Sequence, residues 1–246
     1  MRIVVISDIH SNLEALDAVL DRAREERAEA TYVLGDIVGY GADPNAVVGR
    51  LAEQPSAVCI AGNHDLAATD RFDTDWFNAV AAEAIDWTVS VMDADARAFL
   101  SGLEPRGDAS EGLLVHGSVV DPAAEYVLNL DAARASFDAA EFTRCFFGHT
   151  HLPTLFVNDG GRILGSALRD GRPVSLHADG TKRFMVNPGS VGQPRDGDPR
   201  ASMMIVDTED GSAVVHRVPY AIDKAAGKIR DAGLPLALAD RLSVGR

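Results

Sequence analysis

The sequence predicts an α/β protein, and two observations support this fold class. Short runs of β-branched residues alternate with segments that carry apolar residues at helical spacing, which is the pattern of strand–helix–strand units. The polar residues that follow several of these runs are of metal-binding types, as expected at the carboxyl ends of strands in an open sheet. No linker or internal repeat divides the chain. We therefore expect one domain over residues 1–246, with a helical insert at about 66–103.

The N-terminal third predicts parallel strands joined by helices. Ile3–Ile6 is a continuous apolar run, typical of a strand that is buried on both faces. A helix follows from the capping-box pattern Ser11-Asn12-Leu13-Glu14 to about Glu29. A strand, a short helix opened by proline and another strand come next, at Tyr32–Leu34, Asp43-Pro44 and Ala57–Ile60. Such units imply parallel strands with right-handed crossovers.

The insert is predicted to be mostly helical, because it carries an apolar stripe. The stripe consists of Phe72, Trp76, Phe77, Val80, Ala84 and Trp87. Strands resume at Leu113–Val115 and Cys145–Phe147, and the C-terminal third predicts three strands and a helix, at Arg183–Val186, Met203–Val206, Ala213–Val218 and Ala221–Asp231.

Composition and charge exclude several functional classes. The chain is 46% hydrophobic and 24% charged, an ordinary globular composition. Its net charge of −14 repels nucleic acid phosphates and anionic membranes, so we expect neither long nucleic acid nor a membrane as partner. No apolar run approaches the roughly 18 residues of a membrane span, and the N-terminal apolar run is too short for a signal peptide. Cys59 and Cys145 lie in apolar strands, which indicates buried thiols in a reducing compartment; we expect a cytoplasmic protein.

Five predicted strands are followed by residues that bind metals. These residues are Asp8 with His10, Asp36, Asn63 with His64, His116, and His149 with His151. A site formed by both imidazoles and carboxylates suits Mn²⁺, Fe, Zn²⁺ or Ni²⁺ better than Ca²⁺. These candidates are too many for one tetrahedral ion but enough for two ions that share a carboxylate. Two ions roughly 3.5–4 Å apart form the clamp used in phosphoryl-oxygen displacement.

In this order, the motifs resemble those of calcineurin-like metallophosphoesterases. The matching segments are Asp8-Ile9-His10, Gly35-Asp36, Gly62-Asn63-His64-Asp65, His116-Gly117 and Gly148-His149-Thr150-His151. The chain is most similar to the small bacterial and archaeal phosphodiesterase branch, near diadenosine-tetraphosphate hydrolases. That likeness includes Asp36–Asn45 and the stretch from Asn187 to Arg200. The resemblance covers essentially the whole chain.

The resemblance implies a four-layer αββα sandwich of two mixed sheets flanked by helices. It also implies two divalent transition-metal ions, with manganese as the first choice and Fe, Zn, Ni or Mg as alternatives. One ion would be held by Asp8, His10 and His151, the other by Asn63, His116 and His149, with Asp36 as the bridge.

The implied activity is hydrolysis of a phosphodiester or phosphoanhydride of a small nucleotide-like substrate. A hydroxide that bridges the metals would attack phosphorus, His64 would protonate the leaving oxygen, and Asp65 would orient His64. Arg195 is a candidate for binding a substrate phosphate, with a solvated loop charge as the alternative.

Other functions are also compatible with these residues. A phosphomonoesterase or serine/threonine protein phosphatase would use the same metal core, and a non-catalytic binding scaffold is a third hypothesis. Trp76, Phe77 and Trp87 fit the apolar interior of the insert better than a base-stacking wall. His177, before a predicted hairpin turn, and His216, within a strand, do not fit the constellation. The oligomeric state is not predicted.

Overall fold

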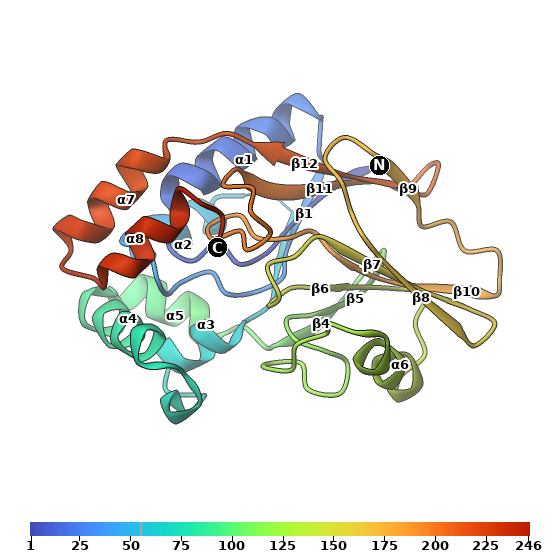
Figure 1. Ribbon diagram of the computed structural model, residues 1–246, viewed down its shortest axis with the longest axis horizontal. Helices are drawn as coiled ribbons and strands as arrows, with labels where there is room; N and C mark the ends of the chain where they lie inside the picture. The colour runs from blue at the N-terminus through green and yellow to red at the C-terminus, as the bar shows by residue number, and fades with distance from the viewer. Residues whose placement is uncertain (55) are drawn as a thin grey trace.

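The computed structural model describes residues 1–54 and 56–246, and two six-stranded sheets form its centre (Figure 1). The first sheet contains β1 (Arg2–Ile6), β2 (Ala30–Val33), β3 (Ala57–Cys59), β9 (Pro173–Ser175), β11 (Ala201–Asp207) and β12 (Ser212–Val218), in the order β3-β2-β1-β11-β12-β9. The second contains β4 (Arg106–Ala109), β5 (Gly112–Val115), β6 (Arg144–Phe147), β7 (Thr154–Asp159), β8 (Arg162–Ala167) and β10 (Lys182–Asn187), in the order β4-β5-β6-β10-β7-β8.

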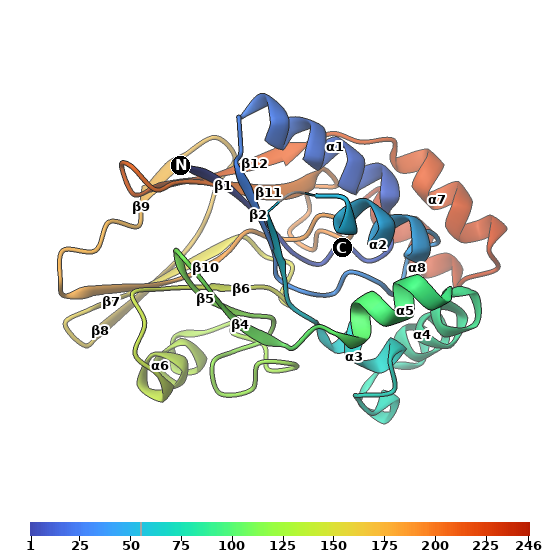
Figure 2. The same ribbon diagram turned by 180° about the vertical axis from the view of Figure 1, so that it is seen from behind.

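Helices cover the outer faces of both sheets and one end of the molecule (Figures 1 and 2). They are α1 (Leu13–Glu25), α2 (Pro44–Ala52), α3 (Asn63–Ala68), the 3-10 helix η1 (Thr74–Trp76), α4 (Ala79–Val91), α5 (Ala94–Ser101), α6 (Leu130–Ala139), α7 (Ile222–Asp231) and α8 (Leu236–Leu242). The architecture is the predicted αββα sandwich. Within the described residues, no helix is both long enough and apolar enough to span a bilayer.

Successive residues of β1 enter different apolar layers, because side chains alternate along a strand. Ile3 and Val5 lie between the two sheets, in the same cluster as Phe146 of β6. Val4 and Ile6 point the other way and pack against helices α1 and α2. A strand that is apolar on both faces is thus the central strand of a covered sheet, as its sequence predicts.

Parallel pairing brings the strand ends to one edge of each sheet. β1 pairs with β2 and β2 with β3 in parallel, and so do β5 with β6 and β6 with β10. β1 pairs with β11 in the antiparallel sense, which makes the first sheet mixed. The loops after β1, β2, β3, β5 and β6 therefore carry the candidate ligands together.

Several element boundaries differ from those that the sequence predicts. Helix α1 is capped one residue later than Ser11, because Asn12 is the N-cap and its side chain accepts a hydrogen bond from the Ala15 N–H. The helix ends at Glu25 rather than about Glu29. His177 does not precede a hairpin turn: the segment around it crosses from β9 in one sheet to β10 in the other.

The insert contains η1, α4 and α5, so it is mostly helical as predicted. Helix α4 packs against α7 and α8 at one end of the molecule (Figure 2). Cys145 is buried in β6 and Cys59 is partly buried in β3, and both are free thiols. Burial raises the pKa of Cys59 to about 12, which keeps this thiol protonated and unreactive.

Candidate metal centre

The strand-end side chains converge in two buried clusters that share one carboxylate. In each cluster, every residue offers one ligand atom, and these atoms lie within 4.8 Å of one another. The first cluster is Asp8, His10, Asp36 and His151, and the second is Asp36, His116 and His149. All six side chains are buried. The two clusters contain the ligands that the resemblance implies, apart from Asn63, and Asp36 is common to both.

Each histidine of the clusters uses one ring nitrogen to hold a backbone carbonyl. Nδ1 of His10 lies 3.2 Å from the Val38 carbonyl oxygen, and Nδ1 of His116 lies 2.7 Å from that of Leu34. His149 makes the corresponding contact through Nε2, which lies 2.9 Å from the Ala124 carbonyl oxygen. The carbonyl accepts a hydrogen bond from the ring N–H and so fixes the tautomer, and in the neutral ring the other nitrogen carries a lone pair. That second nitrogen faces the cluster.

The inward-facing nitrogens meet in pairs. Nε2 of His10 lies 3.2 Å from Nε2 of His151, and Nε2 of His116 lies 3.2 Å from Nδ1 of His149. Two lone pairs at this distance repel each other unless a proton or a cation lies between them. Buried oxygens without a hydrogen-bond partner point to the same need, namely Oδ2 of Asp8 and Oδ1 of Asn63. The donor set therefore fits divalent cations.

Unusual backbone geometry is concentrated at these residues. Asp8, His10, Asp36, His149 and His151 all have positive φ, between 50° and 64°. Residues other than glycine adopt this left-handed region at a cost of order 1–3 kcal/mol, which the surrounding structure must offset. Five of the seven predicted ligands have this strained backbone conformation. The loops therefore bring the side chains together at the expense of favourable backbone geometry.

Burial and neighbouring charges shift the pKa values of the two buried carboxylates in opposite directions. Burial raises the pKa of Asp8 to about 7, and the nearby Asp36 charge adds to the effect. Burial also acts on Asp36, but the imidazoles of His116, His64 and His10 outweigh it and hold the pKa of Asp36 well below its usual range. The same pairing raises the pKa of His116 to about 9 against its own burial. Bound divalent cations would offset this repulsion.

His64 lies beside the clusters in an aromatic surround. Its ring centroid is 4.5 Å from that of Tyr40, 4.8 Å from that of Phe77 and 4.9 Å from that of His10. Its backbone N–H donates to Oδ1 of Asp36, which ties the first turn of α3 to the shared carboxylate. Burial lowers the pKa of His64 to about 4, despite the opposing charge of Asp36.

The Nδ1 side of His64 faces the backbone of Gly39. This nitrogen is buried and has no hydrogen-bond partner among the described residues. Gly39 has φ of +89°, and a Cβ atom there would lie 2.4 Å from the nitrogen. The position therefore requires glycine on two grounds, the left-handed backbone and the close approach of the imidazole.

Asp65 makes other hydrogen bonds than the resemblance implies. Its carboxylate accepts hydrogen bonds from the backbone N–H groups of Ile37, Val38 and Gly62, at 2.9–3.1 Å. No hydrogen bond between this carboxylate and His64 is found among the described residues. Asp65 instead joins the loop after β2 to the N-terminus of α3, so any effect on His64 passes through the backbone.

A pocket of about 550 Å³ opens over the clusters. Asp36, Asn63, His64, His149 and His151 form its floor. Aromatic residues of the insert line one part of it, namely Phe72, Trp76 and Phe77. Trp76 is 84% exposed, so the apolar interior of the insert does not explain this residue. Trp87 is not in the pocket and packs against the cluster formed with α7 and α8. Arg195 lines the pocket as well.

Several residues at the site were not found from the sequence. Tyr126 stacks on His149 with ring centroids 3.9 Å apart, and it comes from a loop that carries no motif. Asn187 donates to the Gly148 carbonyl at 2.7 Å and so supports the loop of His149 and His151. The backbone carbonyl of Gln193 holds Nδ1 of His151. These contacts join segments far apart in the chain, which no local pattern reports.

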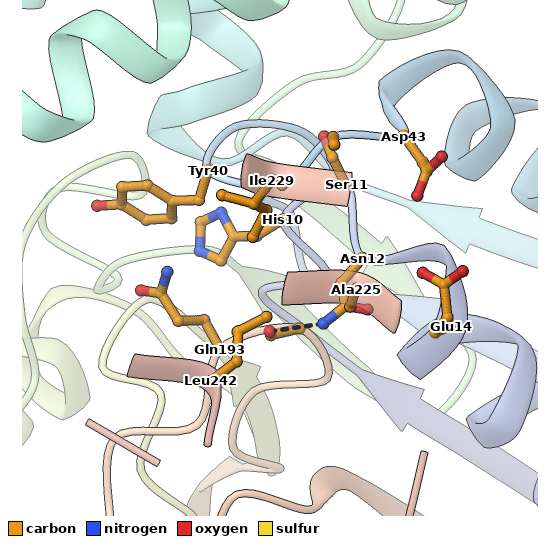
Figure 3. Close-up of a pocket in the computed structure, with 13 residues that line it drawn as sticks. His10, Ser11, Asn12, Glu14, Tyr40, Asp43, Gln193, Ala225, Ile229 and Leu242 are labelled. Atoms are coloured by element: carbon orange, nitrogen blue, oxygen red, sulfur yellow. Dashed lines mark hydrogen bonds between the residues drawn. The ribbon is translucent and has the colours of Figure 1, made fainter. Parts of the chain in front are cut away.

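A second, water-sized cavity of about 10 Å³ lies on the other side of the His10 loop (Figure 3). Ala225 and Ile229 of α7 and Leu242 of α8 form one wall of it. Gln193 lies near His10 and Tyr40 in this view, and Asn12 donates to the Gly192 carbonyl. The C-terminal helices thus pack directly behind the ligand loops.

Known proteins resemble this chain in sequence and in fold. The calcineurin-like phosphoesterase superfamily domain matches residues 1–211. An uncharacterised protein of Methanocaldococcus jannaschii is 39% identical, over 99% of this chain and 98% of that protein. The crystal structure of a metallophosphoesterase from Sphaerobacter thermophilus is also 39% identical, with a TM-score of 0.89 over 100% of this chain and 99% of that one.

A hypothetical protein from Pyrococcus horikoshii OT3 shares the fold, with a TM-score of 0.80 and 20% identity over 100% of this chain and 98% of that one. The superfamily match covers every strand-end motif that forms the buried clusters. The chain therefore belongs to the calcineurin-like phosphoesterase superfamily and is a metal-dependent phosphoesterase.

Proposed function

We propose that this protein hydrolyses a phosphodiester or phosphoanhydride bond of a small nucleotide-like substrate at a two-metal centre. The observation that carries the proposal is the position of Asp36, whose carboxylate belongs to both buried clusters. One ion would be held by Asp8, His10 and His151, and the other by Asn63, His116 and His149.

When bound, two divalent ions supply Lewis-acid stabilisation of the phosphoryl oxygens and activate the attacking water. The protein's own residues position the ligands and move the protons. Asp36 fixes the spacing of the two ligand sets, and the backbone carbonyls behind the histidines keep their tautomers and orientations.

We assign His64 the role of proton donor to the leaving oxygen. It lies in the first turn of α3, adjacent to Asn63 and at the floor of the pocket. Burial favours its neutral form, whereas the negative charge of a bound phosphate favours the protonated form and raises the pKa. His64 would thus gain its proton together with the substrate and release it as the bond breaks.

The pocket supports a small substrate rather than a phosphoprotein. Its volume of about 550 Å³ is in the range of small-molecule sites, which are usually concave and partly apolar. Trp76 and Phe77 offer aromatic faces of the kind that stack on bases, and Arg195 offers a guanidinium for a phosphate. The net charge of −14 disfavours long nucleic acid but affects a small, cation-bound nucleotide little.

Manganese is our first choice of metal, because the mixed histidine and carboxylate ligands suit it, with Fe, Zn, Ni or Mg as alternatives. We further propose that the protein acts in the cytoplasm, without a membrane partner. The free thiols of Cys59 and Cys145 support a reducing compartment.

The test is a comparison of substrates under one Mn²⁺ condition. Dinucleoside tetraphosphates, cyclic nucleotides, bis(4-nitrophenyl) phosphate, 4-nitrophenyl phosphate and phosphopeptides should be compared by kcat/KM. We expect Mn²⁺-dependent turnover with a preference for the diesters and anhydrides. A preference for phosphopeptides or for 4-nitrophenyl phosphate would favour a monoesterase, and no turnover of any ester would favour a binding scaffold.

A further inference from the structure

Two arginines converge on one uncharged oxygen at the margin of the site. Nη2 of Arg195 lies 3.2 Å from Oε1 of Gln193, and Nη1 of Arg241 lies 3.1 Å from the same atom. Arg195 follows the loop that supports the histidines, whereas Arg241 comes from α8. Figure 3 shows the Gln193 amide beside Tyr40 and His10, so the two guanidinium groups meet close to the first ligand cluster.

These two arginines differ from the other arginines of the described chain. Among the other arginines of residues 1–54 and 56–246, some lie within 4.0 Å of a carboxylate. All those that do not are exposed to solvent. Arg195 and Arg241 are half-buried, and within that part of the chain neither forms an ion pair. Nε of Arg195 is in addition buried without a hydrogen-bond partner. Burial and the charge of Arg195 both lower the pKa of Arg241.

Two like charges that share a neutral acceptor repel each other and are unfavourable without a counter-ion. Each guanidinium has five N–H donors in a planar fork that matches phosphate oxygens. Only one nitrogen of each fork takes part in a described side-chain hydrogen bond. The pair thus has both unpaired charge and unused donors, and Arg195 brings them to the pocket over the clusters, which it lines.

We propose that Arg195 and Arg241 form an anion subsite for a second phosphate group of the substrate. Arg195 lines the same pocket as Asp36 and His149, so an anion held there belongs to a molecule whose reacting phosphate lies at the clusters. The substrate class is then a compound with at least two linked phosphates, such as a nucleoside polyphosphate, rather than a simple diester. This inference rests on the proposed function.

Arg241 also gives the C-terminal helices a role at the site. The superfamily domain matches residues 1–211, and α8 lies beyond them. The extension therefore adds a specificity determinant to a metal centre that is complete without it.

The test compares two non-hydrolysable ligands that differ by one phosphonate, methylphosphonate and methylenediphosphonate. Their affinities are measured by calorimetry on the full-length protein at a fixed free Mn²⁺ concentration. We expect Arg241→Gln to weaken methylenediphosphonate binding by about 10- to 100-fold beyond any effect on methylphosphonate, because a hydrogen bond to a charged group is lost. Arg241→Lys should recover part of the difference, since it keeps the charge.

Arg230→Gln is the matched control, because Arg230 is an exposed arginine of the neighbouring helix α7 and is paired with Asp240. It should leave both affinities unchanged. An equal loss for both ligands in Arg241→Gln would show that Arg241 only anchors Gln193, and no loss for either would also overturn the subsite. Absence of Mn²⁺-dependent ester hydrolysis by the wild type would instead contradict the proposed function, and the calorimetry does not depend on turnover.

Discussion

Nε2 of His10 lies 3.6 Å from Oδ2 of Asp36, and both side chains are buried. The same carboxylate oxygen lies 3.4 Å from Nε2 of His116. Both separations are too long for good hydrogen bonds. Two ligands that are each about 2.1 Å from one ion at a tetrahedral angle are about 3.4 Å apart. The Asp36 oxygen therefore has the spacing of a metal ligand toward both clusters.

His64 is expected to act on the leaving group and not on metal binding. His64→Ala should keep its bound metal and lower kcat by about 10²–10⁴-fold, which is the usual contribution of a general acid. The loss should be smaller for esters with a nitrophenolate leaving group, which needs no proton, than for alkoxide leaving groups. Steady-state kinetics on both ester types, with metal analysis of each preparation, makes the comparison. An equal loss of kcat for both ester types would indicate that His64 positions the phosphate and does not protonate the leaving group.

Gly39 is expected to control the position of His64. Gly39→Ala introduces a Cβ that would lie 2.4 Å from Nδ1 of His64, at φ of +89°. A shift of about 1 Å in a catalytic group can cost about 100-fold, so kcat should fall strongly while bound metal is kept. The control is Gly49→Ala in α2, where a Cβ meets no atom within 4 Å. That variant should keep full activity and gain about 0.5–1 kcal/mol of stability. Full activity of Gly39→Ala would show that His64 is not held here.

Helix α7 is joined to α1 and to the start of α2 by two partly buried ion pairs. Nζ of Lys228 in α7 lies 2.7 Å from Oε1 of Glu14 and 2.7 Å from Oδ2 of Asp43. Lys228→Met should lower the free energy of unfolding at pH 7 by about 1–3 kcal/mol, as Glu14 loses a charged partner. Arg24→Met, which removes an exposed pair with Asp21, should cost less than about 1 kcal/mol.

The pH dependence of this pair has a definite sign. Burial alone would raise the pKa of Glu14, but its ion pairs with Lys228 and Lys224 lower the pKa in the folded state. A carboxylate with a depressed folded pKa stabilises the fold above its unfolded pKa of about 4.3 and loses that contribution as pH falls through the folded value. The stability difference between wild type and Lys228→Met should therefore shrink below about pH 4. Chemical denaturation at several pH values measures it, and a constant difference would contradict the ion-pair account.

Trp76 is expected to contribute to substrate binding and not to folding, because its side chain is 84% exposed and lines the pocket. Trp76→Ala should raise KM for a dinucleoside polyphosphate by about 5- to 100-fold, as expected for loss of one stacked base. It should leave the thermal unfolding midpoint and the hydrolysis of ethyl 4-nitrophenyl phosphate, which has no base, almost unchanged. Trp76→Phe keeps an aromatic face and serves as the matched variant. No change in KM would exclude base stacking at this residue.

The sequence predicts the site residues where a metal-binding residue type directly follows a predicted strand. Asp8 and Asp36 directly follow apolar runs, and parallel strands bring their ends to the same edge. That is why local patterns were enough to identify the clustered ligands. The pairing of β1 with β11, by contrast, joins residues about 200 positions apart, and only the resemblance predicted two sheets.

Some elements were missed because their strand character depends on their partners. β4 consists of Arg106–Ala109, which has little apolar character and pairs with β5 at the sheet edge. Helix α6 is a different case, because Asn129 caps it and Ala133 and Phe137 recur at helical spacing. That signal is local, so the sequence alone is enough to predict this helix. Arg241 carried no signal, because its relation to Arg195 is made only by the packing of α8.

The most direct measurement of the central claim is the number of metal ions bound by the wild type and by Asp36→Asn. Elemental analysis after equilibrium dialysis against Mn²⁺ gives this number, with bis(4-nitrophenyl) phosphate hydrolysis measured on the same samples. The account predicts close to two ions per chain in the wild type. It predicts loss of both high-affinity sites in Asp36→Asn, with activity at least about 100-fold lower, because the shared carboxylate loses its charge. An Asp36→Asn protein that keeps two ions and full activity would contradict it.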